Sequence, residues 1–435
     1  MVAAQTSYAS WGGLHMTPAA SLLPLSRAEL TLPAGPWLAY GNGRSYGDSC
    51  FPAAGTLIDM RQLNRILSFD QDSGIIHVEA GLMLGDLIRQ IAPTGWFPAV
   101  VPGTQHVTIG GALANDIHGK NHHRQASFGA HVRRFTLHRS DGRVLSCSPN
   151  ENSALFRASI GGMGLTGLIS TIEMQLMRVP SPAVMQEAIP LANLGDFFTL
   201  APIAEQCSSY VVAWLDSLAT GRKLGRGVLF AGDHAAGEPS EPMSSARFAV
   251  PFTPPFSLIN RSSLKLFNTA YRWRALAQRG PALVSASRFF FPLDGVGHWN
   301  RLYGPRGLRQ HQSVIPLVKA EATIAAMLET TQQARHASFL TVLKLFGDQP
   351  SPGLLSFPRA GATLTLDFPY RGQATDHLLD RLDAMVLAVG GRINPYKDAH
   401  MSRETFHASF PQVEELKAQL DPAARSMFAE RVGLV

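Results

Sequence analysis

The segment 102–129, PGTQHVTIGGALANDIHGKNHHRQASFG, is the stretch of this sequence with the most potential for chemistry. Small residues at 108–112 allow a tight backbone loop whose N–H groups can approach an anion. A dense run of side chains that hold, donate or accept protons follows the loop: Asn115, Asp116, His118, Lys120, Asn121, His122 and His123. Histidine titrates near neutral pH, which suits general acid–base chemistry.

The three histidines of this segment raise the alternative of a metal site. Metal-binding helices space their ligands three or four residues apart and add acidic ligands, whereas this stretch is interrupted by glycine and contains Lys120. We therefore expect no metal ion here. A solvated polar loop without any ligand is a second alternative for the same residues.

Two more glycine-rich segments lie in the first part of the chain. GNGRSYGDS at 41–49 follows a strand predicted at 37–40, and IGGMGLTG at 160–167 precedes a strand predicted at 168–177. The first is not the dinucleotide fingerprint, because its third glycine is displaced and no helical pattern follows it. Taken alone, it is equally typical of a turn without a ligand. Three such loops, counting 108–112, indicate a long, extended ligand that carries phosphate.

Short strands and helices that could position these loops alternate along the chain. Apolar patterning predicts strands at 55–60 and 74–81, and a helix at 82–91. Near the C-terminus, apolar residues on one helical face predict a helix that begins at its N-cap Thr375 and ends at Gly390.

Composition limits the class of protein. The chain has 435 residues, 45% hydrophobic and 16% charged, which is typical of a globular protein with two or three domains. A net charge of +6 and a pI near 9.4 favour anionic partners such as phosphates, nucleic acid or an acidic membrane. Three scattered cysteines argue against a disulfide scaffold or a zinc site. Without a signal peptide or an apolar run of ~20 residues, we expect a cytoplasmic protein, or one peripheral at the inner membrane.

The three loops occur in the order GNGRSYGD, PGTxxVTIGGALANDIHGKNHH and GGMGLTG, and in this order the sequence resembles the flavoproteins of the vanillyl-alcohol oxidase type. Within that family it is most similar to the branch that oxidises a lipid-linked ribose at its 2′-hydroxyl. The resemblance covers essentially the whole chain, through the matching segments WNRLYGPRGLRQHQSVIP, FLTVLKLFG, LTLDFPY, GGRINPYKDAH and ETFHASFP.

The resemblance implies an α+β fold with a two-part FAD-binding domain of the vanillyl-alcohol oxidase (PCMH) type. Residues 1–178 would form the first part of that domain, and residues 392–435 would return to it. Residues 179–391 would form an inserted substrate-binding domain built on an antiparallel β-sheet. FAD is the implied cofactor.

The resemblance also assigns residues to two binding sites. Backbone N–H groups of the glycine loops would hold the FAD pyrophosphate and ribityl chain. The implied FAD-binding residues are Gly41, Asn42, Gly43, Arg44, Ser45, Tyr46, Gly47, Asp48, Gly103, Thr108, Ile109, Gly110, Gly111, Asn115, Asp116, Ile117, His118, Ile169 and Asn394. The implied substrate-binding residues are Lys120, Trp214, Gln310, Gln312, Lys344, Thr365 and Lys397.

Lys397 and His118 are the implied catalytic residues. Alcohol oxidation removes the hydroxyl proton and passes a hydride to the flavin, so a nearby cation can stabilise the negative charge that develops on the ring. Lys397 is the candidate for that cation, or for a base of lowered pKa, because buried lysines shift their pKa readily. His118 is the alternative base. For Lys344 and Lys397 the competing interpretation is a solvated lysine, since most lysines are exposed.

Three positions depart from the family pattern. Arg44 stands where covalent members carry a histidine in the first loop, and the GGALAND loop has no cysteine, so we expect FAD to be bound without a covalent bond. Thr365 occupies the place of a cysteine in the substrate pocket of close relatives. Phe290 replaces an aromatic hydroxyl. The last two changes concern the choice of substrate rather than the oxidation itself.

The implied reaction is oxidation of the 2′-hydroxyl of a polyprenyl-phosphoryl pentose to the keto sugar. This is the first half of an epimerisation to the arabinose form in cell-envelope biosynthesis. A short-chain NAD(P)H-dependent reductase would be the functional partner, and no nucleic-acid partner is implied. One alternative is a sugar-lactone or alditol oxidase that acts on a small free polyol. Another is a flavin-free protein that binds polyprenyl phosphate, which would be colourless when purified.

The segment 244–279 is aromatic and basic at once. Its side chains of these kinds include Phe248, Phe252, Phe256, Arg261, Lys265, Phe267, Tyr271, Arg272, Trp273 and Arg274. Such a mixture suits a membrane interface, so we expect a mobile flap over the substrate entrance that touches a membrane surface. A helix pair packed on the protein core is the alternative.

Overall fold

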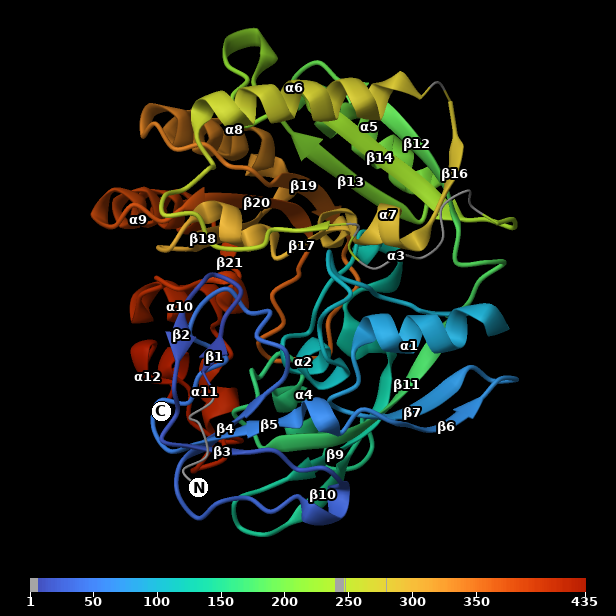
Figure 1. The fold of residues 1–435 in the computed structure, drawn as a ribbon, viewed down its shortest axis with the longest axis vertical. Helices are drawn as coiled ribbons and strands as arrows, with labels where there is room; N and C mark the ends of the chain where they lie inside the picture. The colour runs from blue at the N-terminus through green and yellow to red at the C-terminus, as the bar shows by residue number, and fades with distance from the viewer. Residues whose placement is uncertain (1–6, 239–245, 247, 279) are drawn as a thin grey trace.

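Two β-sheets form most of the N-terminal part of the computed structural model, which describes residues 7–238, 246, 248–278 and 280–435 (Figure 1). One is a parallel sheet of order β3-β5-β4: β3 (Ala20–Leu22), β4 (Trp37–Tyr40) and β5 (Thr56–Asp59). The other is antiparallel, of order β10-β9-β11-β7-β6 with β8 also paired to β11. Its strands are β6 (Ile66–Asp70), β7 (Ile75–Glu79), β8 (Trp96–Pro98), β9 (Val132–His138), β10 (Val144–Cys147) and β11 (Leu168–Arg178).

The middle of the chain forms an antiparallel eight-stranded sheet of order β16-β12-β14-β13-β19-β20-β18-β21. Its strands are β12 (Val184–Leu191), β13 (Tyr210–Leu215), β14 (Gly227–His234), β16 (Ala282–Val284), β18 (Leu308–Ile315), β19 (Thr341–Phe346), β20 (Gly361–Pro369) and β21 (Arg392–Ile393). Two short pairs complete the strands: β1 (Tyr8–Ala9) with β2 (His15–Met16), and β15 (Phe248–Ala249) with β17 (Val296–Gly297).

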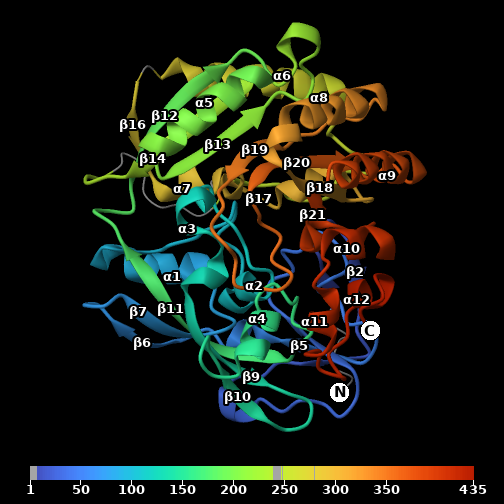
Figure 2. The ribbon, with the colours of Figure 1, turned by 180° about the vertical axis from the view of Figure 1, so that it is seen from behind.

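Helices cover both faces of the eight-stranded sheet (Figures 1 and 2). On one face lie α5 (Leu194–Cys207), α8 (Leu317–Gln333) and α9 (Gln373–Ala388). They bury an apolar core that includes Phe197, Ile324 and Leu382. On the other face α6 (Arg261–Ala277) places Tyr271 against Trp214 of β13. A shorter helix, α7 (Ala286–Phe290), packs beside β12.

The remaining helices belong to the N-terminal part and the C-terminus: α1 (Leu84–Ile91), α2 (Ile109–Ala114), α3 (His122–Gln125), α4 (Ser153–Ser159), α10 (Arg403–Ser409), α11 (Val413–Lys417) and α12 (Met427–Arg431). The C-terminal segment packs back onto the start of the chain. The Trp37 N–H donates to the carbonyl of Ala423 (2.8 Å), and Arg431 pairs with Asp48 (2.8 Å). None of the helices in the described part of the chain combines the length and hydropathy needed to cross a membrane.

The expected α+β class is confirmed, and the strands predicted in the first part of the chain are present. The two-part arrangement is supported by the sheets, and we keep it as a proposal with one adjustment. The return was expected at 392, but β21 is still the edge strand of the eight-stranded sheet. The chain therefore leaves that sheet after Ile393, and Lys397 ends a short 3-10 helix (Pro395–Lys397).

One other expectation was wrong in detail. The C-terminal helix α9 begins after Gly372, not at Thr375. Thr375 lies inside its first turn, where the hydroxyl accepts the N–H of Arg371 (2.8 Å). Within the segment 244–279, α6 is a helix that buries Leu264 and Asn268, and the mobile flap stays a prediction. Residues 244, 245, 247 and 279 lie outside the described residues.

Candidate active site

The polar residues of the site share one face of the strands β18, β19 and β20. Side chains alternate between the two faces of a strand, so the leucines of β19 and β20 point into the core under α5, α8 and α9. Gln310, Gln312, Lys344 and Thr365 take the opposite face and line a cavity. The antiparallel register sets Gln312 directly opposite Thr365, and Gln310 opposite Asp367.

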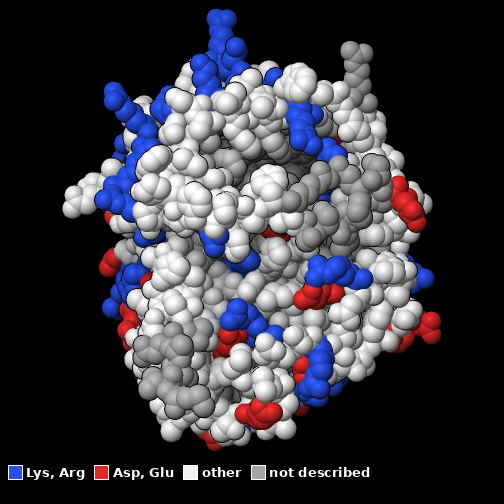
Figure 3. All heavy atoms as spheres, viewed as in Figure 1, with Lys and Arg blue, Asp and Glu red and all other residues white. Residues whose placement is uncertain are grey.

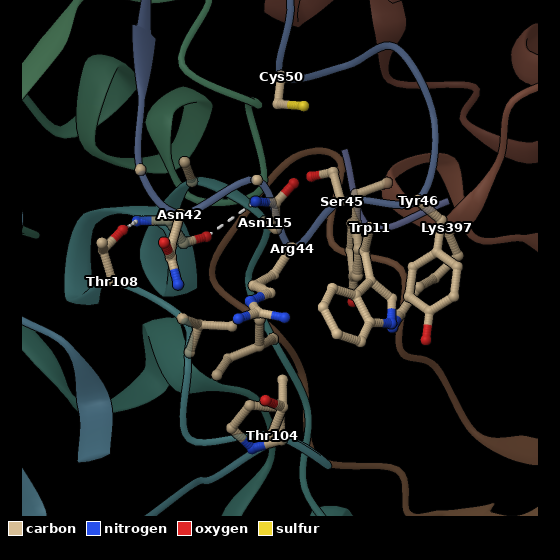
Figure 4. Close-up of a pocket in the computed structure, with 18 of the residues that line it drawn as sticks. Trp11, Asn42, Arg44, Ser45, Tyr46, Cys50, Thr104, Thr108, Asn115 and Lys397 are labelled. Carbon is tan, nitrogen blue, oxygen red and sulfur yellow. Dashed lines mark hydrogen bonds between the residues drawn. The ribbon is translucent and has the colours of Figure 1, made fainter. Parts of the chain in front are cut away.

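The cavity lies between this face and the glycine loops of the N-terminal part (Figure 4). Met163, Gly164 and Gly167 of the third loop also line it. The residues predicted for FAD or substrate that line it are Gly41, Asn42, Gly43, Arg44, Ser45, Tyr46, Gly103, Thr108, Gly110, Gly111, Asn115, Ile117, His118, Ile169, Gln310, Gln312, Lys344, Thr365 and Lys397. All three glycine loops therefore meet at one cavity, as their shared chemistry predicted.

The first glycine loop offers backbone N–H groups to the cavity. Among the described residues, the N–H groups of 42–45 donate to no protein acceptor. The loop packs directly on the second one, because a Cβ on Gly41 would lie 2.5 Å from Thr108 Oγ1. Gly43 has φ +58°, which favours glycine. Buried N–H groups need acceptors, and pyrophosphate oxygens supply them. The residues present therefore fit the phosphates of FAD.

His118 is held by a chain of hydrogen bonds. The Asn394 amide donates to Gln312 Oε1 (2.9 Å), which turns the amide nitrogen of Gln312 towards His118 Nε2 (3.0 Å). Nε2 must accept this bond, and Nδ1 lies 3.4 Å from the Tyr396 hydroxyl. Burial and then Lys344 hold the pKa of His118 well below its usual range. The ring is therefore a neutral imidazole whose accepting nitrogen is already engaged.

Three half-buried lysines lie at the cavity (Lys344 and Lys397) or beside it (Lys120). Burial, and then the charge of Lys344, lowers the pKa of Lys120 to about 7. Burial, and then Lys397, lowers the pKa of Lys344 to about 7. Burial also lowers the pKa of Lys397, although the carboxylate of Asp367 opposes that shift. A group of positive charges taken out of water favours an anionic ligand.

Arg44 projects into the cavity from the position expected for a tethering histidine. Its guanidinium lies 4.1 Å from the ring centroid of Trp11. Figure 4 shows the two side chains next to each other. Burial lowers the pKa of Arg44, and the nearby Asp294 partly compensates. Asp294 in turn accepts the N–H of Gln105 (2.8 Å) and the Thr104 hydroxyl (3.1 Å). Arginine offers no nucleophile for a covalent flavin bond.

Two predicted substrate residues lie beside the cavity without lining it. Lys120 Nζ donates to the carbonyl of Phe289 and lies 4.5 Å from the centroid of that ring. Trp214 is covered by Tyr271 of α6, with 4.8 Å between the ring centroids. A direct contact of Trp214 with a ligand in this cavity therefore requires α6 to move.

Several predicted FAD residues also do not line the cavity: Gly47, Asp48, Ile109, Asp116 and Asn394. Gly47 packs against the backbone of Asp398, Asp48 pairs with Arg431, and Ile109 is fully buried in the apolar core. Asp116 accepts hydrogen bonds from three serine hydroxyls and one N–H, and Asn394 supports Gln312. These residues position the loops, so a direct role for them in FAD binding stays a proposal that the geometry does not favour.

Several lining residues were missed by the sequence analysis. They are Trp11, Cys50, Asp294, Trp299 and Tyr396 among others. Tyr396 had a usable signal, because it directly precedes Lys397 in the matching segment GGRINPYKDAH. Trp11 and Asp294 had none, since each reaches the cavity only through contacts with residues distant in sequence.

The three clustered histidines do not converge on one point. His118 takes part in the bonds described above, the ring of His122 packs on Phe346 (4.5 Å between centroids), and His123 Nε2 lies 3.3 Å from the carbonyl of Ser208. Within the described residues, no group of three or more histidine, cysteine or acidic side chains is arranged to hold a metal ion.

Comparisons with known proteins agree with this arrangement. A family described as the FAD binding domain matches residues 34–148, which contain the first two glycine loops. Decaprenylphosphoryl-β-D-ribose oxidase of Mycolicibacterium smegmatis is 33% identical over 88% of this chain and 86% of that protein. This chain belongs to the decaprenylphosphoryl-β-D-ribose oxidase family. It is an FAD-dependent oxidoreductase that acts on CH–OH groups.

Other relatives of this oxidase-family chain are less informative. A protein of Streptomyces coelicolor, named as uncharacterised and from the mprA 5′ region, is 32% identical over 81% of this chain and 100% of that protein. Mouse L-gulonolactone oxidase is 30% identical over 34% of this chain and 35% of its own length. The family resemblance and the FAD cofactor expected from the sequence are confirmed.

Thr365 allows a direct test of the substrate side of the cavity. A threonine hydroxyl is not a soft nucleophile, and burial raises the pKa of the lining residue Cys50 to about 12, so Cys50 stays a thiol. Iodoacetamide should therefore leave the cavity unlabelled, whereas Thr365→Cys should gain a label at residue 365. Peptide mass spectrometry reads the position, and exposed Cys207 serves as the internal positive control. A label on Cys50 in the unmodified sequence, or none on Thr365→Cys, would contradict the assignment.

Proposed function

We propose that this protein oxidises the 2′-hydroxyl of a polyprenyl-phosphoryl pentose to the keto sugar, as the first half of an epimerisation to the arabinose form in cell-envelope biosynthesis. The name of the Mycolicibacterium relative supports this substrate class. The observation that carries the proposal is the group of half-buried lysines at the cavity (Lys344 and Lys397) and beside it (Lys120). A small neutral polyol gains nothing from three lysines in one place, whereas a phosphoryl group stabilises their charged forms.

The side chains have separable parts in this proposal. FAD, when bound, supplies the acceptor for the hydride that leaves the sugar carbon. Lys397 provides a positive charge at the wall of the cavity. Lys344 also lines the cavity and has a pKa lowered to about 7, so its neutral form accepts the proton that leaves the hydroxyl. Lys120, beside the cavity, attracts the phosphoryl group. Gln312 and His118 form a neutral, prealigned edge that can bond to sugar hydroxyls. Because Nε2 of His118 already accepts the Gln312 amide, we assign it to orientation rather than to proton removal.

The experiment that tests this function is anaerobic bleaching of the yellow flavin. A panel of polyprenyl-phosphoryl pentoses, the corresponding free pentoses, and small lactones and alditols should be mixed with the purified protein. We expect fast bleaching only by the lipid-linked ribose, and the keto sugar as the product. Bleaching by a free polyol at least as fast would replace the proposal with a lactone or alditol oxidase. A colourless protein without FAD would overturn the proposal altogether.

Acid precipitation tests how the FAD is held. It should leave the FAD in the supernatant, because Arg44 forms no covalent bond with the flavin.

A keto sugar must be reduced on the opposite face before an epimerisation is complete. We propose a short-chain NAD(P)H-dependent reductase as the separate functional partner for this step. Its addition with NAD(P)H should convert the keto product to the arabinose form, whereas this chain alone should stop at the keto sugar.

We also propose that α6 and the segment before it contact an anionic membrane, where a polyprenyl substrate resides. Apolar side chains project from this surface and are 65–75% exposed: Phe248, Phe252, Phe256, Leu266 and Trp273. Basic side chains stand between them, including Lys265, Arg272 and Arg274. Lys and Arg side chains gather along the upper rim of the molecule in Figure 3, where α6 lies in Figure 1. Exposed aromatics among cations suit the lipid interface.

Binding to vesicles containing anionic phospholipid should weaken as salt is added and should fall about tenfold or more when Lys265, Arg272 and Arg274 are all changed to Gln. A matched control removes three exposed arginines from the FAD-binding part, Arg133, Arg134 and Arg143. This control should bind like the unmodified protein in a sedimentation assay. Equal losses in both triple variants would mean that net charge, not the α6 surface, drives binding.

A further inference from the structure

A buried carboxylate, Asp367, lies behind the cavity wall. Asp367 is in β20 with no exposed surface, and its side chain accepts a hydrogen bond from the Gln310 amide. Among the described residues, its second oxygen has no partner, and neither do Gln310 Oε1 nor the hydroxyl of Tyr303. Burying an acid with so few partners costs stability, so its presence needs a reason other than packing.

The neighbours of Asp367 lead to Lys397. Gln310, which bonds to Asp367, also interacts with the hydroxyl of Tyr46. Lys397 Nζ lies over the face of the Tyr46 ring, 4.2 Å from its centroid. Asp367 and Lys397 thus lie on two sides of one short polar array, assembled from β18, β20, the first glycine loop and the short helix that ends at Lys397.

The groups around Lys397 show why Asp367 matters for the charge of that lysine. Lys344 and His118 face Lys397 from β19 and from the loop after α2, and Tyr46 and Tyr303 stand beside Asp367. The positive charge of Lys344 disfavours a positive charge on Lys397, whereas the two tyrosines and His118 are neutral. Burial raises the pKa of Asp367 to about 7, and the Gln310 hydrogen bond and the charge of Lys397 oppose that rise. In its ionised form Asp367 supplies the negative charge that raises the pKa of Lys397 against the effect of burial.

We propose that Asp367 is a positioning residue that keeps Lys397 protonated and seated over the Tyr46 ring, so that a positive charge is present when the flavin is reduced. Asp367 itself does not line the cavity and acts through Gln310 and Lys397. Its catalytic consequence rests on the proposed function, but its effect on the charge of Lys397 does not. The test can therefore be made without any sugar.

Sulfite is the probe for that charge, because this anion bleaches oxidised flavin on binding and binds better beside a cation. Sulfite affinity of the holoprotein should be titrated against pH for the unmodified chain, Asp367→Asn, Asp367→Glu, Gln310→Ala and Lys397→Met. We expect affinity to fall as pH rises through the pKa of Lys397. Asp367→Asn should move that midpoint down by about one pH unit or more. Gln310→Ala should move it in the same direction by less, Asp367→Glu should restore it, and Lys397→Met should remove it.

The matched control is Asp383→Asn. Asp383 is another buried carboxylate near these strands, and it bonds to His311 Nε2 (3.1 Å) on the opposite face of β18. Its loss should leave the sulfite midpoint unchanged. An unchanged midpoint in both Asp367→Asn and Gln310→Ala, with FAD retained, would overturn the inference. If the sulfite midpoints shift as expected but no polyprenyl-phosphoryl sugar bleaches the flavin, the inference stands and the proposed substrate fails.

Discussion

Changing Lys397 to methionine should slow the reduction of the flavin by substrate by a factor of about 100 or more while leaving FAD bound. Lys397 lines the cavity, and its half-buried side chain places the ammonium over the Tyr46 ring. Methionine keeps the length and apolar contacts of the side chain but removes the charge. A fixed cation that meets developing negative charge in a dry cavity is worth several kcal/mol, so its loss falls mainly on the hydride-transfer step.

Single-turnover bleaching under anaerobic conditions isolates that step from reoxidation. Lys319→Met, at an exposed position of α8, is the control for a lysine-to-methionine change and should bleach at the normal rate. The visible spectrum and the FAD content of Lys397→Met should match the unmodified protein. A near-normal bleaching rate in a variant that retains FAD would remove Lys397 from the mechanism and return His118 to consideration as the principal group.

Features that depend on neighbours in sequence were predictable. The strand expected at 37–40 is β4, and the strands expected at 55–60 and 74–81 contain β5 and β7. Alternating apolar residues and glycine-rich turns are local sequence signals, and they predict strands and turns without any knowledge of distant contacts. The same holds for the glycine loops, whose composition alone indicated a phosphate ligand.

Features that depend on distant contacts were not predictable from local patterns. Asp116 stands among the FAD-binding residues in the motif, but its partners Ser351 and Ser356 lie 235 and 240 positions away in sequence. Trp214 was expected at the sugar, yet α6 covers it with Tyr271. Asp367 lies in an apolar strand, LTLDFPY, and only the pairing of β20 with β18 sets it beside Gln310. In each case the partner, not the residue itself, decides the role.

Thr375 shows a different limit. Its type and position suit a helix N-cap, but α9 starts three residues earlier, after Gly372. The Thr375 hydroxyl then bonds back to the N–H of Arg371 and to His336 Nε2 (3.1 Å). A threonine near a helix start can cap the helix as its N-cap residue, or it can bond back to the backbone from inside the first turn. The hydrogen bond to the buried His336 favours the second pattern here.

Changing Asp116 to alanine should destabilise the holoprotein by about 3 kcal/mol or more, seen as a fall in Tm of roughly 3 °C or more. The carboxylate is fully buried and joins the loop after α2 to the segment that leads into β20. It accepts the N–H of Gly129 and the hydroxyl of Ser127 (both 2.7 Å), as well as the hydroxyls of Ser351 and Ser356. Without it, several buried donors lose their partner at once.

The backbone of Asp116 complicates that substitution, because its φ of +40° disfavours alanine on its own. Asp116→Gly removes the same hydrogen bonds without that penalty, so it should lose a similar amount of stability if the bonds are responsible. Asp116→Asn keeps an acceptor and should lose less, and Ser351→Ala removes a single donor and should lose least. Because Phe357 of the tethered segment packs on the His118 ring (5.6 Å between centroids), the two severe variants should also release FAD more readily. A normal Tm for Asp116→Gly would mean that the loss of stability in Asp116→Ala comes from backbone strain. The carboxylate would then not be what joins the two parts of the site.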